Sequence, residues 1–437
     1  MRRVLYVSLH FPPLGGVGVQ RNAYFVRHLP EFGWKPHVLT GPGDRSRPLR
    51  DRSMLDLIPS DVGISRTRVL DLDRVFAKLA KVRLSGVAKL CTLALPAMEP
   101  GWVPFAVRRG LELASDGSFD VIYSSSYPMS SHLVALLLKK RTGLPWVADY
   151  RDEWSIRRML KWRTELHHWL ARHLDRWFVR TADRVVTTSP EHSRRFRQTF
   201  GGESEKFVTV TNGYDEDDFR GPVPSRPSDL RGKFLISHVG SVFEWRNANA
   251  FLEAVRICID GGVIPPDRLR VAFVGPNRTR LPRDLTERGN LVMPGYVAHS
   301  DAVAWMRFSD VLLLINSERT NIPAKTFEYL AAGNPILALV REGPTAELVR
   351  EAGAGTVIGG EDVNSVSATL SDLYRKWERG ELAKTASSPV VTRFSRRATT
   401  ERLARVLQEA VGPEAAGDGL ESSFGSRRSN ALSGGER

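Results

Sequence analysis

The sequence predicts an α/β protein built from two Rossmann-like domains that face a central cleft. In both halves of the 437-residue chain, short β-rich runs alternate with helical patterns, which is typical of parallel sheets covered by helices. Residues 212–232 are rich in Pro and Asp and have the composition of a linker between the halves. The length suits two domains, and two cysteines, Cys91 and Cys258, exclude a disulfide scaffold or a thiolate metal cage.

The first half contains five expected strands. They fall at residues 4–9, 36–40, 119–124, 146–149 and 184–188. A helix is expected after the loop that ends at Gly18, another over residues 133–140, and a long amphipathic one before the fifth strand. Strands separated by helices in this way favour a parallel sheet covered on both faces.

The second half repeats this alternation. Strands are expected at residues 234–238, 270–274, 290–292, 311–315, 336–339 and 356–358, with helices at 249–259, 301–308 and 324–332. We therefore divide the chain into a first domain (1–211), a linker (212–232), a second domain (233–392), a closing helix (393–411) and a tail (412–437). The tail has almost no large apolar residues and is expected to be disordered.

The net charge is +14 and is spread unevenly. Residues 1–220 hold 35 Lys and Arg against 24 Asp and Glu, whereas the rest of the chain holds 28 against 25. A basic half favours an acidic partner such as a phosphate-bearing substrate, anionic lipid or nucleic acid, and a solvated Arg-rich surface is the alternative. The acidic run at residues 215–218 is expected to be solvated linker.

A glycine-rich loop follows the first expected strand. Residues 11–21 read Phe-Pro-Pro-Leu-Gly-Gly-Val-Gly-Val-Gln-Arg and open a helix. Glycines let backbone amides approach a phosphate or sugar, and a helix N-terminus favours negative charge. The loop lacks the G-x-G-x-x-G spacing, and the acidic ribose partner about 20 residues further on is missing. Gly16 thus belongs either to a ligand loop or to a plain tight turn.

A second motif begins the helix expected at 324–332. Pro323 suits a first helical turn, and Gly333 and Pro335 suit its end. Lys325 and Glu328 lie three residues apart and therefore project from one face. The first-turn amides and Lys325 can hold a diphosphate, and Glu328 can accept hydrogen bonds from ribose hydroxyls. A surface ion pair on an ordinary helix is the alternative.

Residues 322–336 resemble the donor-binding motif P-[SA]-K-x-x-E-Y-x-x-x-G-x-P of family-4-like glycosyltransferases of the GT-B fold, in the bacterial surface-polysaccharide branch. Further blocks are similar to that group, so the resemblance covers nearly the whole chain. They are residues 11–21, 33–34 with 38–40, 146–152, 211–215 and 238–241. The resemblance implies two Rossmann-like domains, with a C-terminal helix that crosses back onto the first.

The resemblance also implies roles for individual residues. Glu328 binds the donor ribose, and the loop of Gly295, Tyr296 and Val297 cradles the base. Ser241 leads to a region where the family places a basic residue for the diphosphate, here Arg246, with Lys325 alongside. We place Gly16, Pro323 and Thr326 with these donor-binding residues. The family retains configuration at the anomeric carbon, and its habit favours UDP.

The sequence departs from the family pattern at two places. Thr320 stands where many members have a first Glu, with Glu318 two residues earlier, and no His ends the strand at residues 147–152. Arg151 and Asp152 are candidates there for acceptor binding or proton handling, with a buried Arg–Asp structural pair as the alternative. His132 is a third catalytic candidate, and its alternative is a helix-start His without a catalytic role.

No metal or cofactor is expected to be required. The sequence Asp71-Leu72-Asp73 matches D-x-D but lies in no clear strand-to-loop context. In the GT-B scaffold, helix dipoles and basic side chains stabilise the leaving diphosphate.

The expected location is the cytoplasm, peripheral on the inner face of the cell membrane. No apolar run reaches the roughly 18–20 residues that a membrane span needs. Residues 156–180 interleave Arg and Lys with Leu and Trp, and residues 75–98 are similar. Such segments can lie on an anionic membrane, whereas a buried Leu/Trp stripe with a solvated Arg face is the alternative. No nucleic-acid-binding module is recognisable, so nucleic acid is not an expected partner.

The leading hypothesis is thus a glycosyltransferase that moves a sugar from a nucleotide-sugar to a saccharide or lipid-linked acceptor. A nucleotide-sugar epimerase of the same fold is a second reading. A non-catalytic sugar-nucleotide-binding subunit is a third.

Overall fold

The computed structural model describes residues 1–43, 51–71, 98–156, 164–241, 248–276, 281–384 and 389–412. Several predictions fall outside these ranges: the role of Arg246, the Asp73 half of the D-x-D sequence, almost all of the basic segment 75–98, and the tail from residue 413 on.

The first lobe is built on a seven-stranded parallel sheet with the order β3-β2-β1-β4-β5-β6-β7. Its strands are β1 (Arg2–Val7), β2 (Trp34–Thr40), β3 (Gly63–Arg66), β4 (Val121–Ser125), β5 (Trp146–Tyr150), β6 (Arg184–Thr187) and β7 (Phe207–Thr209). The central strands are buried on both faces, as expected for a parallel sheet between helix layers. Two of these strands, β3 and β7, were not expected from the sequence. Both are short edge strands, without a long apolar run to mark them.

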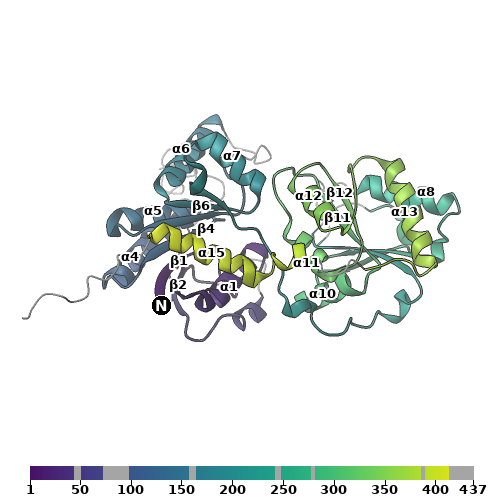
Figure 1. Cartoon of the computed structure of the whole chain (residues 1–437), viewed down its shortest axis with the longest axis horizontal. Helices are drawn as coiled ribbons and strands as arrows, with labels where there is room; N and C mark the ends of the chain where they lie inside the picture. Colours follow the sequence, from purple (N-terminus) through teal and green to yellow (C-terminus); the bar gives the residue numbers. More distant parts are fainter. Residues whose placement is uncertain are drawn as a thin grey trace, which may run out of the picture.

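Helices cover both faces of this sheet (Figure 1). They are α1 (Val17–His28), α4 (Val103–Ala114), α5 (Ser130–Thr142), α6 (Glu165–Thr181) and α7 (Pro190–Phe200). Short 3₁₀ turns are η1 (Leu29–Phe32), η2 (Arg52–Leu55), η3 (Pro100–Trp102) and η4 (Ser204–Lys206). Hydroxyl caps begin two of the helices: Thr164 accepts from the His167 amide and Ser189 from the His192 amide.

The second lobe has a six-stranded parallel sheet with the order β10-β9-β8-β11-β12-β13. Its strands are β8 (Phe234–Val239), β9 (Leu269–Val274), β10 (Leu291–Gly295), β11 (Val311–Asn316), β12 (Ile336–Val340) and β13 (Gly355–Ile358). Its helices are α8 (Asn249–Asp260), α9 (Arg283–Glu287), α10 (His299–Phe308), α11 (Ala324–Ala332), α12 (Pro344–Glu351), α13 (Val363–Glu378) and α14 (Pro389–Thr392). The 3₁₀ turns η5 (Asp217–Phe219), η6 (Ser228–Leu230) and η7 (Pro266–Arg268) complete the region after residue 212.

Both sheets share one strand order, in which the first strand of the lobe lies between its second and fourth. This is the doubly wound order, and ligands bind at the carboxyl ends of its strands where the order reverses. The reversal lies between β1 and β4 in the first lobe and between β8 and β11 in the second. The prediction of two Rossmann-like domains is therefore confirmed.

The final helix, α15 (Arg396–Val411), returns to the first lobe (Figure 1, yellow). Leu403 and Leu407 are buried in the same apolar cluster as Val4 and Tyr6 of β1. Ser395 caps the helix by accepting from the Ala398 amide. The expected helix that crosses back is thus present.

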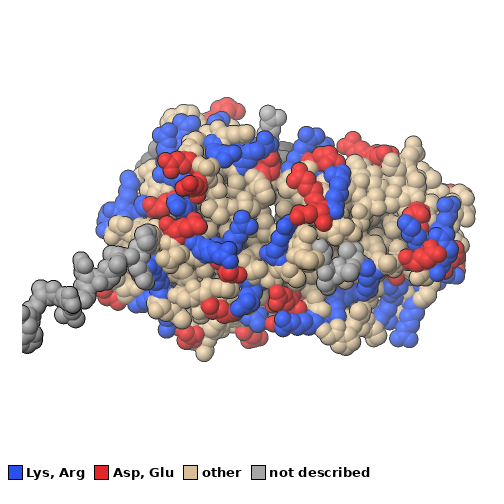
Figure 2. All heavy atoms as spheres, in the orientation of Figure 1, with Lys and Arg blue, Asp and Glu red and all other residues tan. Residues whose placement is uncertain are grey.

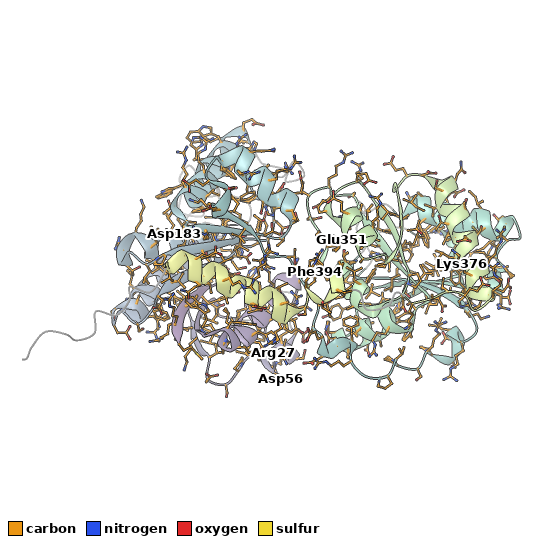
Figure 3. All side chains as sticks on the ribbon, viewed as in Figure 1. Arg27, Asp56, Asp183, Glu351, Lys376 and Phe394 are labelled. Atoms are coloured by element: carbon orange, nitrogen blue, oxygen red, sulfur yellow. The ribbon has the colours of Figure 1, made fainter. Side chains whose placement is uncertain are left out.

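Two chain segments cross side by side between the lobes. The Tyr214 amide donates to the Phe394 carbonyl at 3.1 Å, and the Arg396 amide donates to the Tyr214 carbonyl at 2.8 Å. Gly213 permits this approach, because a Cβ there would lie 2.2 Å from the Phe394 carbonyl oxygen. Figure 3 places Phe394 and Arg27 at the boundary of the lobes. Among the residues that the structure describes, no helix combines the length and apolarity that a bilayer span requires.

Candidate active site

A cavity of about 530 Å³ lies between the lobes, at the carboxyl ends of both sheets. The first lobe and the linker contribute Gly16, Val17, Gly18, Gln20, Asp51, Met54, Arg151, Asp152, Thr188 and Asn212. The second lobe contributes Val239, Gly240, Ser241, Val274, Gly275, Pro276, Tyr296, Val297, His299, Ala302, Met306, Asn321, Ile322, Pro323, Ala324, Lys325 and Glu328. This is the place that the shared strand order predicts for a ligand.

The start of α11 brings Lys325 and Glu328 to the cavity wall. The helix spans Ala324–Ala332 between Pro323 and a left-handed Gly333, as its sequence predicts. Burial raises the pKa of Glu328 above its ordinary value, against the opposing positive charges of His299, Arg396 and Lys325. Side chains of opposite sign thus stand at one helix N-terminus, as a diphosphate and a ribose would require.

The loop after β10 contributes Tyr296 and Val297 to the cavity. Gly295 is the last residue of β10 and has a φ of +75°, which turns the chain into the loop. The side chain of Tyr296 is 64% exposed. The loop therefore forms part of the cavity wall and leaves the Tyr296 ring open to solvent.

The glycine loop lies on the opposite wall. Gly16 has a φ of +110° and immediately precedes α1. A Cβ on Gly18 would lie 1.0 Å from Nη1 of Arg151, so only glycine lets that guanidinium lie against the helix start. Arg151 donates from Nε to the Ser126 carbonyl and from Nη2 to the Tyr127 carbonyl, the latter at 2.9 Å. The loop thus shapes the position of Arg151.

Arg151 and Asp152 both line the cavity. The buried Arg–Asp pair of this region is a different one, between Arg21 of α1 and Asp149 of β5. Arg21 donates from Nε and Nη2 to the two Asp149 oxygens, each at 3.0 Å, and both side chains are almost completely buried. This bidentate geometry is the strong form of an Arg–carboxylate pair.

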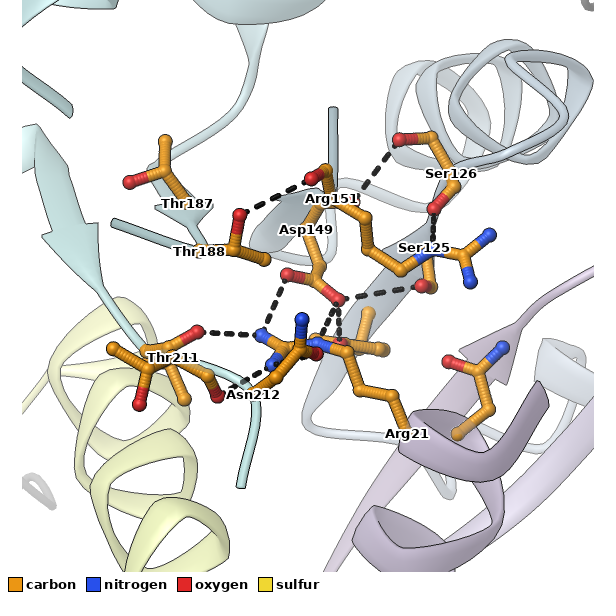
Figure 4. Close-up of polar contacts among 12 residues, drawn as sticks. Arg21, Ser125, Ser126, Asp149, Arg151, Thr187, Thr188, Thr211 and Asn212 are labelled. Atoms are coloured by element: carbon orange, nitrogen blue, oxygen red, sulfur yellow. Dashed lines mark hydrogen bonds and ion pairs between the residues drawn. The ribbon is translucent and has the colours of Figure 1, made fainter. Parts of the chain in front are cut away.

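The Arg21–Asp149 pair joins three segments of the cleft (Figure 4). Arg21 also donates to the carbonyls of Thr211 and Val210, at 2.7 and 2.8 Å, where the chain leaves the first lobe. Asp149 further accepts from Tyr123 at 2.7 Å. Burial opposes ionisation of Asp149, but Arg21 outweighs it and holds the carboxyl pKa below its ordinary value. The pair is ionised and fixes the glycine-loop helix, the end of β5 and the linker together.

His132 lies in the core of the first lobe and does not line the cavity, which corrects its place among the catalytic candidates. Its Nδ1 lies 2.8 Å from the Ser124 hydroxyl, and its ring packs on Tyr150 with centroids 4.5 Å apart. Burial lowers the pKa of the imidazole to about 3, so the ring is neutral. The start of α5, where His132 lies, thus turns this side chain toward the core of the lobe and not toward the cleft.

Thr326 is also misplaced among the donor-binding residues. Its side chain is fully buried, and the cavity wall does not include it. Its position on α11 lies between those of Lys325 and Glu328, on the side of the helix that packs into the lobe.

The acidic run 215–218 is more than a solvated linker. Asp215 and Asp217 each lie 3.4 Å from the guanidinium of Arg27 on α1. Asp218 lies 2.7 Å from Nε2 of His299, which lines the cavity at the start of α10. The hydrogen bond to Asp218 raises the pKa of His299. His299 was not among the residues expected at the site, because its partner lies 81 positions away in the chain and no local pattern links the two.

A second contact joins the lobes beside Arg151. The Ser189 hydroxyl donates to the carbonyl of Thr320, the residue that stands where many relatives have a Glu. Arg151, Asp152 and Asn321 line both the main cavity and a small polar one of about 20 Å³ behind it. The loop after β11 therefore reaches the end of β5.

The described residues contain no group of three or more His, Cys, Asp or Glu side chains arranged to hold a metal ion.

Two family models match the chain in succession. The first, a glycosyl transferase 4-like domain, matches residues 15–213, and the second, glycosyl transferases group 1, matches residues 233–376. The paired lobes, the cleft and these matches define the class as a GT-B enzyme. The chain belongs to the family-4-like glycosyltransferases.

Similar proteins agree with this assignment. The chain is 25% identical to a D-inositol 3-phosphate glycosyltransferase of Thermobispora bispora, over 94% of this chain and 95% of that protein. A glycosyltransferase from Rickettsia africae has a similar structure, with a TM-score of 0.67 and 13% identity over 94% of this chain and 98% of that one. HepE of Anabaena, solved in complex with UDP, has a TM-score of 0.60 and 16% identity over 93% and 99%.

Proposed function

We propose that this glycosyltransferase moves a sugar from a nucleotide-sugar, with UDP as the favoured nucleotide, to a saccharide or lipid-linked acceptor in surface-polysaccharide synthesis, with retention at the anomeric carbon. The observation that carries the proposal is the placement of Lys325 and Glu328 at the first turns of α11, on the wall of the cavity between the lobes. UDP is supported by the family pattern and by the UDP complex of HepE.

In the proposed donor site, the second lobe holds the nucleotide. Glu328 accepts from the ribose hydroxyls, while Lys325 and the N-terminus of α11 hold the diphosphate. The backbone at Tyr296 and Val297 receives the base. Gly16, Ser241 and Pro323 line the same cavity and complete its wall. These groups stabilise the leaving diphosphate by charge and hydrogen bonds, without requiring a metal.

The first lobe contributes the proposed acceptor side. Arg151 and Asp152 face the cavity across from α11. Arg151 is suited to hydroxyl or anionic groups of the acceptor, and Asp152 is suited to accept from an acceptor hydroxyl. Closure of the lobes would exclude water, which otherwise hydrolyses the donor.

The proposal includes docking of the first lobe on anionic membrane through α6. Leu166, Trp169 and Trp177 on this helix are 55%, 54% and 39% exposed, so the apolar stripe is not wholly core. Arg172, Arg176 and Arg180 are exposed on the same helix. On the face shown in Figure 2, basic and acidic side chains are interspersed, so the proposal rests on α6 rather than on net charge.

Vesicle binding tests this part separately. The protein should sediment with anionic vesicles at low salt, less at high salt, and less when Trp169 and Trp177 are both replaced by Ser. If the wild-type protein ignores anionic vesicles at low salt, membrane docking fails and the transferase proposal stands.

The donor site is tested by nucleotide binding. A thermal-shift screen against UDP, GDP, ADP and TDP should select one nucleotide, because a bound ligand raises the apparent stability. Glu328→Gln should weaken its affinity about ten- to a hundred-fold, since a hydrogen bond to a charged group contributes about 1.5–3 kcal/mol. Glu347→Gln on α12, an exposed glutamate outside the cavity wall, is the matched control.

Turnover separates the remaining readings. Sugar transfer that depends on an added acceptor supports the proposal. Isomerisation of the sugar-nucleotide in the absence of an acceptor would instead favour an epimerase. Binding without turnover over a range of acceptors would favour a non-catalytic subunit, and unchanged affinity in a folded Glu328→Gln variant would contradict the ribose role.

A further inference from the structure

The ammonium group of Lys325 contacts a histidine that is buried behind the cavity wall. Nζ of Lys325 lies 2.9 Å from Nε2 of His238, the fifth residue of β8. His238 is completely buried, and its ring packs near that of Phe273 on β9, with centroids 6.2 Å apart. His238 lies on β8 and Lys325 on α11, and the two residues are 87 positions apart in the chain.

The other ring nitrogen fixes the tautomer of His238. Nδ1 lies 2.9 Å from the carbonyl oxygen of Leu313 on β11. A carbonyl oxygen only accepts, so Nδ1 carries the proton. Nε2 of the neutral ring then presents its lone pair to Lys325, whose ammonium has only donors to offer. The contact is therefore a hydrogen bond from a cation to a neutral acceptor.

Two glycines make room for this contact. A Cβ on Gly240 would lie 2.5 Å from Nζ and 2.9 Å from Cε of Lys325. A Cβ on Gly275 would lie 2.9 Å from the Gly240 carbonyl carbon. Both glycines have φ above +120° and both line the cavity. The ends of β8 and β9 are thus shaped around the lysine side chain.

We propose that His238 is a positioning residue, which orients the Lys325 ammonium toward the donor diphosphate while leaving its positive charge uncancelled. A carboxylate in the same place would orient the ammonium equally well but would offset its charge next to a dianionic ligand. A neutral imidazole lone pair orients it without that cost. This inference rests on the proposed donor site and assigns a role to a residue that does not itself line the cavity.

Three variants of His238 separate positioning from simple packing. In His238→Asn, the amide sits near the Nδ1 position, so it keeps a donor for Leu313 and loses the contact with Lys325. In His238→Gln, the longer side chain carries an amide oxygen near the Nε2 position, so it keeps an acceptor for Lys325. His238→Leu removes both polar contacts. Lys325→Met removes the ammonium group, and its loss of UDP affinity measures how much that group contributes to binding.

The measurement is the affinity of each variant for UDP and for uridine, or for the corresponding pair if the screen above selects another base. His238→Asn and His238→Leu should weaken UDP binding about tenfold, leave uridine binding unchanged, and add no further loss when combined with Lys325→Met. His238→Gln should recover most of the UDP affinity. The thermal stabilities of the variants should not rank in the same order as their UDP affinities, because stability also depends on the contact with Leu313.

The outcomes distinguish this inference from the donor site on which it rests. If wild-type protein binds UDP more tightly than uridine, and His238→Asn keeps that difference, positioning by His238 is overturned and the donor site stands. Equal losses for UDP and uridine, or losses that track thermal stability, would also overturn it, since a packing defect predicts both. If the wild-type protein binds no nucleoside diphosphate, the donor site and this inference fail together.

Discussion

Two sets of charged residues beside the cleft, one in each lobe, use charge in opposite ways. On the first lobe, Arg21 and Asp149 are almost completely buried and bind each other through two hydrogen bonds. On the second lobe, Lys325 and Glu328 are only partly buried and face the cavity. Since both lobes share one strand order, topology does not cause the difference. Arg21 and Asp149 use charge to hold segments of the first lobe together, whereas Lys325 and Glu328 place charge on the cavity wall.

The energetic consequences differ as well. A buried ion pair contributes little relative to apolar residues of the same size, but removal of one partner leaves an uncompensated charge in the interior. A partly exposed charged group costs little to replace, because water solvates what remains. We therefore expect substitutions of Arg21 or Asp149 to lower stability, and substitutions of Lys325 or Glu328 to lower affinity.

The largest effect is expected for Asp149→Ala, which should lower the stability of the first lobe by about 3–5 kcal/mol. Thermal or urea unfolding measures it. The matched control is Asp372→Ala, which breaks an exposed pair with Lys376 on α13 and should cost about 0.5 kcal/mol or less. If Arg21→Met combined with Asp149→Leu is as unstable as Asp149→Ala, the uncompensated charge is not the cause.

Gly18→Ala should damage activity without damaging the fold. Its Cβ would displace the end of the Arg151 side chain, which is flexible, while alanine suits the first turn of α1. A displacement of about 1 Å at a positioned group can cost about a hundredfold in rate, so kcat/KM should fall by that order while Tm stays level or rises. Gly18→Ala should add little to Arg151→Ala. A full additional loss in the double variant would contradict this explanation.

Asp218→Asn should show a small effect that depends on pH. The hydrogen bond raises the pKa of His299 above its unfolded value, so its stabilising contribution is complete below about pH 6.5 and disappears as pH rises through the raised pKa. The variant should lose about 0.2–1 kcal/mol at pH 5.5 and nothing at pH 9. Asp217→Asn is the control, because Asp217 pairs with Arg27 and Arg220, which stay charged at both values. Equal losses at both pH values for Asp218→Asn would refute the linkage.

No change in activity is expected on chelation. In the proposed donor site the leaving diphosphate is held by Lys325 and the N-terminus of α11, neither of which needs a metal. Initial rates with and without EDTA provide the measurement. A rate that falls with EDTA and returns with a divalent cation would show that the leaving group is stabilised differently.

Local sequence patterns predict the second wall of the cleft more accurately than the first. Proline and glycine mark both ends of α11, so its bounds and the positions of Lys325 and Glu328 follow from the sequence alone. Arg21 and Asp149 are 128 positions apart, and no local pattern links them. His132 shows the same limit, since the face to which a helix start turns depends on packing by distant residues such as Phe178.

Short edge strands and long-range pairs account for most of what the sequence did not reveal. β7 has three residues and β3 has four, and neither has the apolar run by which the central strands were recognised. His299 and Asp218 meet only because the linker folds against α10. Parallel sheets, and helices with proline and glycine at their ends, can thus be predicted from local sequence patterns. The polar contacts that join distant segments cannot.

The return of α15 to the first lobe has a consequence for how the chain is made. Leu403 and Leu407 cover apolar side chains of β1, so the first lobe lacks part of its interior until synthesis has passed residue 407. During translation, an N-terminal fragment exposes that apolar surface, which favours chaperone binding or aggregation. A chain that ends before residue 403 therefore leaves apolar side chains of β1 exposed, although β1 was synthesised first.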